Sequence, residues 1–300
     1  MLSMLNSDQL EKLKKAGRVS AEARDLGLSM VAEGVKLFDV AEEVESYIKS
    51  HGCKLAFPCN ISINEVAAHY TPSPDDKSVF DFGDVVKVDC GAHIDGFVGD
   101  TAGTVEVGSN RFRDLIEASK DARDSVMEFI GEGCVINEIG KVVDMTIRSR
   151  GFVPIRNLTG HEIQPYNLHA GLAIPNYDDG NTDKLQAGMI IACEPFATNG
   201  EGLIESGRPG NICRLVRADK PLKEPALQEF LDYIKEEFST FPFCARSCDW
   251  PKANLLLNKL VRQGVASSYA ILNEVKGGCV TQSEHTVYIA GNKGEITTIY

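Results

Sequence analysis

The spacing of apolar residues along the chain predicts pairs of helices. From about Asn6, apolar residues recur every three or four positions, which is the period of an amphipathic helix. Residues 31–52 then predict the end of this helix, a turn at Gly34 and a second helix that closes at Gly52.

The same pattern returns 99 residues later. Residues 130–151 align with residues 31–52 without a gap, and a helical pattern from about Asn110 to Ile130 precedes them. The identical positions are Glu33 and Glu132, Gly34 and Gly133, Val44 and Val143, Ile48 and Ile147, Ser50 and Ser149, and Gly52 and Gly151. A repeat of this kind indicates an internal duplication.

The duplication extends to the predicted strands. FGDVVKVD ends at Asp89 and AGMIIACE ends at Glu194, and both are runs rich in β-branched residues that finish in an acid. The segment GDT around Asp100 is echoed by SEHT around Glu284. We therefore expect an α+β fold in which two similar halves contribute equivalent acids to a shared centre.

A predicted hairpin places two of these acids together. Asp95-Gly96 is a strong two-residue turn signal. With this turn, Gly91 lies opposite Asp100, and Asp89, two residues before Gly91, faces the same side. The two carboxylates are then diagonal neighbours within roughly 7–8 Å, where they repel unless a cation lies between them. The alternative is a pair of hydrated acids on an open sheet face, which the apolar flanking residues disfavour.

A histidine adds a nitrogen to this set of oxygen ligands. His161 follows a strand-like segment, and carboxylates with imidazole suit Mn, Fe, Co or Zn rather than calcium. The candidate metal ligands are, in chain order, Asp89, Asp100, His161, Glu194 and Glu284. His69 and His169 occupy nearly equivalent places in the duplication, which favours substrate contact over the alternative of two structural histidines. Glu162, beside His161, is expected to be hydrated or to support the ligands.

Composition narrows the setting. The chain has 300 residues, 43% hydrophobic and 25% charged, which is ordinary for a globular protein. Its net charge of −12 argues against nucleic acid as a specific partner, and no apolar run reaches the length of a membrane span. We expect a cytoplasmic monomer without a signal peptide. Nine scattered cysteines indicate reduced thiols, and Cys244 and Cys248 lack the second pair that a structural zinc site requires.

Several segments resemble those of a known family. VKVDCGAHIDGFVGDTA, NLTGHEIQPYNLHAG, ACEPFATNG and QSEHT resemble signature segments of the methionine aminopeptidases, and FPCNISINEVAAHYTP is similar to type 2, the archaeal and eukaryotic kind. The long N-terminal extension of eukaryotic members is absent, so the chain looks like the compact archaeal form. The resemblance implies a pita-bread fold with pseudo-two-fold symmetry.

The resemblance also implies the domain organisation. Residues 223–267 predict helices, and type 2 members are similar in having a helical, winged-helix-like insertion here. Residues 1–222 and 268–300 would then form the catalytic domain. One departure is Ser283, where the family usually has a bulky phenylalanine. A second departure is CARSCDW, at residues 244–250, which is longer than the corresponding segment.

By matching positions, the resemblance assigns roles to individual residues. Asp89 and Glu194 would each bind one of two divalent metal ions, and His161 would join Glu194. Asp100 and Glu284 would bridge the ions. The implied catalytic residues are His69, His169 and Glu194; the implied substrate-binding residues are His69, His169, Phe57, Pro58, Leu168 and Tyr269.

The implied activity is removal of the N-terminal methionine from nascent proteins and peptides, with preference for a small second residue. A metal-bound hydroxide would attack the first peptide carbonyl, and contact with the ribosome would be at most transient. Two other readings stay open from the sequence. One is a prolidase or aminopeptidase P, which usually has an added N-terminal domain. The other is an inactive binding protein of the same fold, which would have lost metal ligands.

Overall fold

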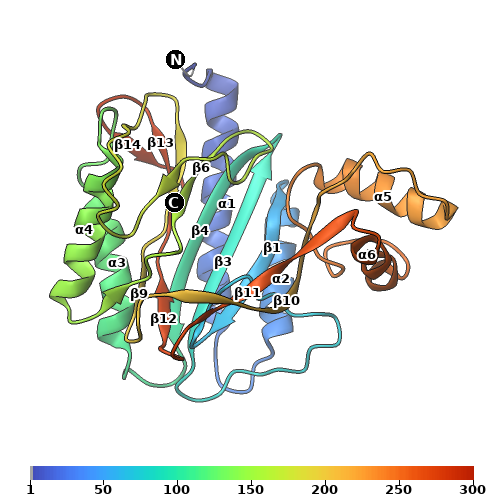
Figure 1. Cartoon of the computed structure of the whole chain (residues 1–300), viewed down its shortest axis with the longest axis horizontal. Helices are drawn as coiled ribbons and strands as arrows, with labels where there is room; N and C mark the ends of the chain where they lie inside the picture. Colours follow the sequence, from blue (N-terminus) through green and yellow to red (C-terminus); the bar gives the residue numbers. More distant parts are fainter. Residues whose placement is uncertain (1–2) are drawn as a thin grey trace.

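The computed structural model describes residues 3–300 (Figure 1). The helices are α1 (Ser7–Met30), α2 (Leu37–Ser50), α3 (Arg113–Met127), α4 (Ile136–Ser149), α5 (Pro225–Phe238) and α6 (Ala253–Arg262). The strands are β1 (Lys54–Ile63), β2 (Val66–Ala68), β3 (Val85–Ile94), β4 (Phe97–Glu106), β5 (Val153–Pro154), β6 (Gly160–Ile163), β7 (Ala173–Ile174), β8 (Ile190–Cys193), β9 (Phe196–Thr198), β10 (Ile204–Leu215), β11 (Ala266–Glu274), β12 (Val280–Gln282), β13 (His285–Ile289) and β14 (Gly294–Ile296).

The predicted duplication is visible in the helices. α2 and α4 have the same length, and both of their ends differ by the offset of 99 found in the sequence. The turns that precede them contain Gly34 and Gly133, with φ of 80° and 82°, and the helices are followed by Gly52 and Gly151, with φ of 73° and 84°. Glycine adopts these positive φ values without steric cost, so the repeated glycines mark equivalent turns.

Each half has its own hydrophobic core. In the first, α1 and α2 pack behind β1, β3 and β4, and Val44 and Val88 are buried between them. In the second, α3 and α4 lie at the left of Figure 1, and the equivalent residues Val143 and Cys193 are buried in their core. The equivalence extends the sequence repeat into the packing.

The strand pairing confirms the predicted hairpin. β3 and β4 pair antiparallel, with Ile94 opposite Phe97 and Gly91 opposite Asp100. The corresponding strands of the second half, β8 and β13, pair antiparallel in the sheet β14-β13-β8-β6-β7. α1 lies so close against β4 that a Cβ added at Gly99 would come within 2.3 Å of the Gly17 Cα.

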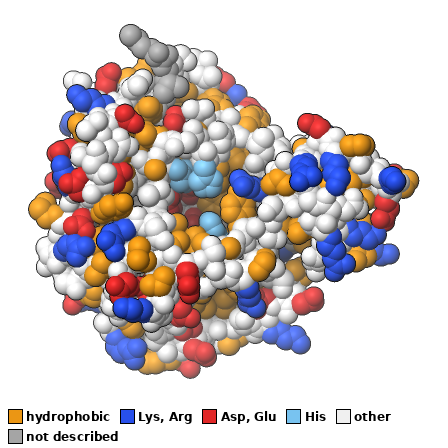
Figure 2. All heavy atoms as spheres, in the orientation of Figure 1, with side chains coloured by type: hydrophobic (Ala, Val, Ile, Leu, Met, Phe, Trp, Pro, Cys, Tyr) orange, Lys and Arg blue, Asp and Glu red, His pale blue; other side chains and the backbone are white. Residues whose placement is uncertain are grey.

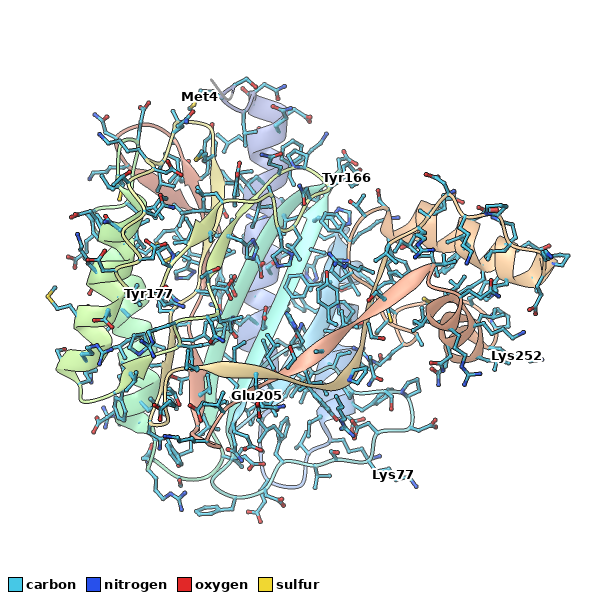
Figure 3. The ribbon with its side chains drawn as sticks, viewed as in Figure 1. Met4, Lys77, Tyr166, Tyr177, Glu205 and Lys252 are labelled. Carbon is cyan, nitrogen blue, oxygen red and sulfur yellow. The ribbon has the colours of Figure 1, made fainter. Side chains whose placement is uncertain are left out.

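α5 and α6 project to the right of the rest of the molecule in Figure 1. α5 buries Leu227, Phe230, Leu231 and Ile234, the face that the sequence predicted. In α6 the buried residues are Leu256, Leu257 and Leu260, whereas Leu255 is exposed. Figure 3 shows Lys252 at the far end of this projection and Tyr177 on the opposite side of the molecule. Across residues 3–300, no helix combines the length and apolarity needed to cross a bilayer.

Candidate metal centre

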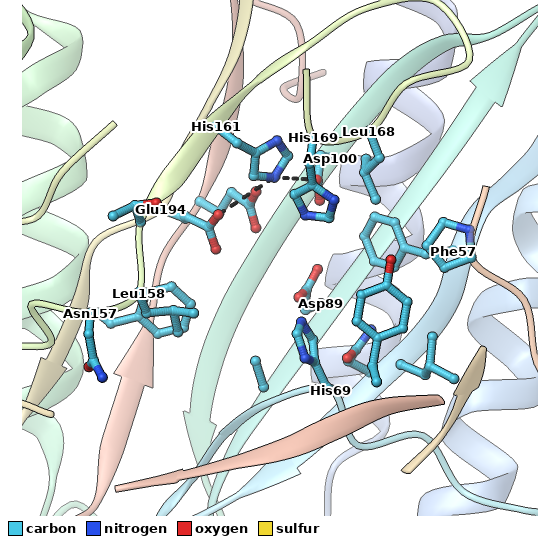
Figure 4. A pocket seen from close by; sticks show the side chains of 18 residues that line it. Phe57, His69, Asp89, Asp100, Asn157, Leu158, His161, Leu168, His169 and Glu194 are labelled. Atoms are coloured by element: carbon cyan, nitrogen blue, oxygen red, sulfur yellow. Dashed lines mark ion pairs between the residues drawn. The ribbon is translucent and has the colours of Figure 1, made fainter. Parts of the chain in front are cut away.

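The five predicted ligands converge at the junction of the two halves. Asp89 lies on β3, Asp100 on β4 and His161 on β6, while Glu194 directly follows β8 and Glu284 directly precedes β13. The imidazole Nε2 of His161 is 3.6 Å from Asp100 Oδ2 and 3.6 Å from Glu194 Oε1 (Figure 4). Ligand atoms of Asp100, His161 and Glu284 lie within 4.8 Å of one another.

Hydrogen bonds between the halves fix the backbone at this junction. The Asp100 N–H donates to Thr286 Oγ1 (2.7 Å), and the Thr286 hydroxyl donates to the Asp100 carbonyl (2.8 Å). The Thr101 hydroxyl donates to the Glu284 carbonyl (2.8 Å), and the Glu284 N–H donates to the Ala102 carbonyl (3.0 Å). These bonds hold β4 of the first half against β13 of the second, so the acids of the two halves face one another.

Burial makes the cluster electrostatically costly without a cation. Desolvation, with the hydrogen bond from Gln282 acting in the other direction, raises the pKa of Asp89 to about 7. Desolvation and neighbouring carboxylates raise the pKa of Asp100, Glu194 and Glu284 well above their ordinary values. Desolvation and the nearby His169 lower the pKa of His161 to about 3, so its imidazole is neutral.

The residues fit a divalent metal. Asp89 Oδ1 and Asp100 Oδ1 are buried without a hydrogen-bond partner among residues 3–300. Within the same residues, no lysine or arginine forms a salt bridge with the four carboxylates. Clustered carboxylate oxygens and a neutral imidazole nitrogen are a donor set for Mn, Fe, Co or Zn, and a cation would relieve the repulsion that raises these pKa values.

Two residues of the centre were not assigned from the sequence. Gln282 Nε2 donates to Glu194 Oε2 and to Glu284 Oε2, both at 3.3 Å. Its place two residues before Glu284 was the available signal, since alternate residues of a strand share a face. Asn60 lies opposite Asp89 in the β1–β3 register, and its Oδ1 is buried without a hydrogen-bond partner in the described part of the chain.

A cavity of about 250 Å³ opens over the cluster. The predicted ligands line it together with Phe57, His69, Leu168, His169 and Tyr269, and so do Ala68, Phe196, Ile212 and Pro242, which the sequence did not single out. Pro58 is buried but does not line the cavity. Figure 2 shows histidine side chains inside the hollow between the body and the insertion.

The two near-equivalent histidines lie at different places around the cavity. His69 has a φ of 68°, a strained value for a residue other than glycine, and its Nδ1 is 3.2 Å from the Ala270 carbonyl. That carbonyl can only accept, so Nδ1 donates and Nε2 is left as an acceptor. His169 is exposed, with its ring centroid 4.4 Å from that of His161. Desolvation lowers the pKa of both His69 and His169, so both are neutral at pH 7.

Ser283 has a polar neighbour in this fold. The side chain is buried, and its hydroxyl is 3.4 Å from that of Ser119 on α3. A small polar pair therefore occupies the place where the family resemblance leads one to expect an aromatic ring. The neighbouring Glu284, a predicted ligand, still lies in the acid cluster.

Glu162 does not contact solvent as a hydrated acid would. It is 7% exposed, and the Gln164 side-chain amide donates to its carboxylate at 2.8 Å. Of the two expectations for Glu162, hydration is therefore wrong, and support of the predicted ligands stays a prediction. Glu162 lies on β6 directly after His161, and successive side chains of a strand point to opposite faces.

Known proteins share this sequence and architecture. Metallopeptidase family M24 matches residues 11–219. A methionine aminopeptidase from Methanocaldococcus jannaschii is 42% identical over 292 residues, covering 96% of this chain and 98% of the relative. The solved structure of a methionine aminopeptidase from Thermotoga maritima has a TM-score of 0.74 at 24% identity and is covered over 100% of both chains.

The prolidase from Pyrococcus furiosus has a TM-score of 0.62 at 18% identity, and the match covers 99% of this chain but 65% of that one. These likenesses confirm the predicted pita-bread fold, and the match with the archaeal relative spans nearly the whole length of both chains. The chain therefore belongs to metallopeptidase family M24 and, within it, to the methionine aminopeptidases, which remove N-terminal methionine in a metal-dependent reaction.

Proposed function

We propose that the cavity holds the first residue of a polypeptide, with its α-amine and first carbonyl at the acid cluster. The observation that supports this most directly is the meeting of the ligand cluster with a largely apolar wall in one cavity. Pockets of this kind combine an apolar lining with a few convergent polar groups that fix the ligand's orientation. A free N-terminus would be required because its α-amine would bind at the cluster.

Two divalent ions are proposed to bind here. Asp89 and Glu194 would each hold one ion, His161 would share the ion of Glu194, and Asp100 and Glu284 would bridge. The contacts of His161 with Glu194 and Asp100 support this division. When bound, such ions polarise the substrate carbonyl and lower the pKa of water so that it can act as a nucleophile.

The protein's own side chains would move the protons and orient the peptide. Glu194 would accept the proton of the attacking water on its carboxylate and deliver it to the departing amine. Gln282 restrains Glu194 Oε2 for this step. His169, as a neutral donor, would stabilise the developing oxyanion, while His69 would accept the N–H of the scissile peptide at its Nε2.

Specificity for methionine would come from the apolar wall. Phe57 and Leu168 are 7% and 8% exposed, and Tyr269 lies beside His69. A pocket that selects by shape discriminates by about 1–3 kcal/mol per methylene, so it should accept norleucine. A small second residue would be preferred because the following peptide must pass the histidines at the cavity rim.

The proposed setting is the cytoplasm, where the chain would act as a monomer on nascent polypeptides and contact the ribosome transiently. All nine cysteines are free thiols, which suits a reducing compartment. A net charge of −12 gives no support for specific nucleic-acid binding.

The insertion is proposed to be a subdomain of residues 223–267, with residues 1–222 and 268–300 forming the catalytic body. Its helices share a hydrophobic core that includes Phe230, Leu257 and Val265. A winged-helix-like arrangement is supported by the two helices standing beside β10 and β11.

The test is turnover of Met-X-Ser peptides by metal-stripped protein reconstituted with Mn, Fe, Co or Zn. We expect cleavage when X is small and none when X is bulky, and His161→Ala should abolish it. His51→Ala, an exposed helix-end substitution outside the cavity, is the matched control. Preference for X-Pro peptides, or full activity of His161→Ala, would refute the proposal.

A further inference from the structure

A buried arginine in the insertion reaches back to the catalytic body. Arg246 lies in the segment between α5 and α6, and its side chain is 3% exposed. Its guanidinium donates to Glu45 Oε1 on α2 (2.7 Å), to Glu42 Oε1 (2.8 Å) and to Thr71 Oγ1 (2.9 Å). A buried ion pair is weak support for a role in stability alone, so the position of its partners matters.

Two of these partners hold a single backbone residue of β1. Glu45 Oε1 accepts the Cys59 N–H at 2.9 Å, and the Thr71 hydroxyl donates to the Cys59 carbonyl at 2.7 Å. Cys59 has no opposite residue in the β1–β3 register. Side chains anchored by Arg246 therefore satisfy both backbone groups of a residue that the sheet leaves unpaired.

Cys59 lies in a bulge that shapes the cavity. Phe57 is opposite Gly91 and Asn60 is opposite Asp89, so three steps along β1 correspond to two along β3. Bulges redirect the side chains on either side of them. The Phe57 ring lies on Gly91, where an added Cβ would come within 2.5 Å of it, and both Phe57 and Asn60 line the cavity.

Pro58 explains how the restraint on Cys59 reaches Phe57. Proline fixes its own φ and restricts the residue before it, so Phe57 and Cys59 are joined by a stiff link. Pro58 thus contributes to the pocket through the backbone, without lining it.

We propose that Arg246 is a positioning residue for the methionine pocket: through Glu45 and Thr71 it fixes the β1 bulge, and with it the place of Phe57. Arg246 itself does not line the cavity. The inference rests on the proposed function for the identity of the ligand, while the restraint on the bulge is independent of it. The insertion, through residue 246, would then set how closely the pocket fits its substrate.

The experiment measures kcat and KM of metal-reconstituted protein on Met-Ala-Ser and norleucine-Ala-Ser. Arg246→Ala should raise KM for Met-Ala-Ser by roughly tenfold and reduce the preference for methionine over norleucine. We expect little change in kcat, because the lost contact is made equally in the ground state and the transition state. Arg246→Lys keeps the positive charge but lacks the planar guanidinium, so its KM should lie between those of the parent and Arg246→Ala. Glu42→Ala, which removes an exposed partner that does not touch Cys59, should stay within about twofold of the parent.

Thr71→Val keeps the experiment decisive if Arg246→Ala does not fold. It removes one bond to Cys59 and leaves the ion pair with Glu45, and we expect KM to rise with cooperative unfolding retained. A folded Arg246→Ala protein, or a folded Thr71→Val protein, with the parent's KM and the parent's preference for methionine overturns the inference.

Hydrogen exchange separates this inference from the proposed function. If the parent does not cleave methionyl peptides, the proposed function fails and the amide of Cys59 is still informative. Faster exchange at Cys59 in Arg246→Ala, with unchanged exchange in residues 85–94, supports the restraint on the bulge. Unchanged exchange at Cys59 refutes it.

Discussion

The two halves of the molecule have kept their helices alike and let their strands diverge. α2 and α4 match end for end, and each packs into its own core. In the first half, the two-residue turn Asp95-Gly96 joins β3 to β4. In the second half, some ninety residues, including α5 and α6, separate β8 from β13. The helical layers thus repeat in both halves. The residues between β8 and β13 supply the proposed insertion and part of the cavity wall.

The comparison also explains the unequal ligands. Asp89 and Glu194 are equivalent, as are Asp100 and Glu284, but the first half has Ser62, not a histidine, at the place of His161. An imidazole on one side only makes the two proposed metal positions chemically different. The substitutions below test where the halves are interchangeable and where they are not.

Among the substitutions that compare the two halves, the largest effect is expected from the two acids proposed to bridge the metal ions. Asp100→Asn and Glu284→Gln, one from each half, should lower kcat by similar factors on the order of 10³, because each removes part of a metal contribution of several kcal/mol. The measurement is turnover of Met-Ala-Ser together with metal binding by calorimetry. A hundredfold difference between the two variants would show that the acids are not equivalent.

The next effect concerns His69 and His169, which are near-equivalent in sequence but lie differently around the cavity. His169→Ala should lower kcat by about 10²-fold through loss of an oxyanion donor. His69→Ala should lower it less, because its Nε2 is left as an acceptor by the bond to Ala270. Equal losses in single-turnover rates would contradict the assignment of different roles.

Metal removal should make stability depend on pH. The folded-state pKa of Asp89, about 7, is above its ordinary value, so the stabilising protonated form is present at low pH and lost as pH rises towards 7. The metal-free protein should therefore melt at a lower temperature at pH 8 than at pH 5, whereas added metal should stabilise it more at pH 8, because binding requires deprotonated ligands. Asp89→Asn is the control, and in the metal-free protein it should make the melting temperature depend less on pH. An unchanged pH dependence would argue against Asp89 as its origin.

The smallest effect tests whether the two cores are equal. Ile48→Val and Ile147→Val remove the same methyl group from identical, fully buried positions of α2 and α4. Each should lower the free energy of unfolding by about 0.5–1.5 kcal/mol, measured by denaturant titration with metal present. Clearly different losses in the free energy of unfolding would show that the two helical layers are not packed equally.

Much of this protein follows from local sequence. The period of apolar residues and the repeated glycines predict α1 to α4 with their turns, since helix formation depends on neighbours three and four residues apart. The Asp95-Gly96 turn fixes the register of β3 and β4, and therefore the relation of Asp89 to Asp100. The resemblance to a family gave the complete order of candidate ligands, and all five candidates lie together in the structure.

Only the tertiary structure decided the contacts that cross the chain. Gln282 donates to Glu194 across 88 positions, and Arg246 meets Glu45 across 201 positions. Neither pairing leaves a periodic signal, because neither is governed by neighbours along the chain. The sequence alone determined the repeated helices, the β3–β4 hairpin and the chemistry of the candidate centre. The packing of the two halves against each other decided which side chains support the candidate ligands and which contacts hold the pocket wall.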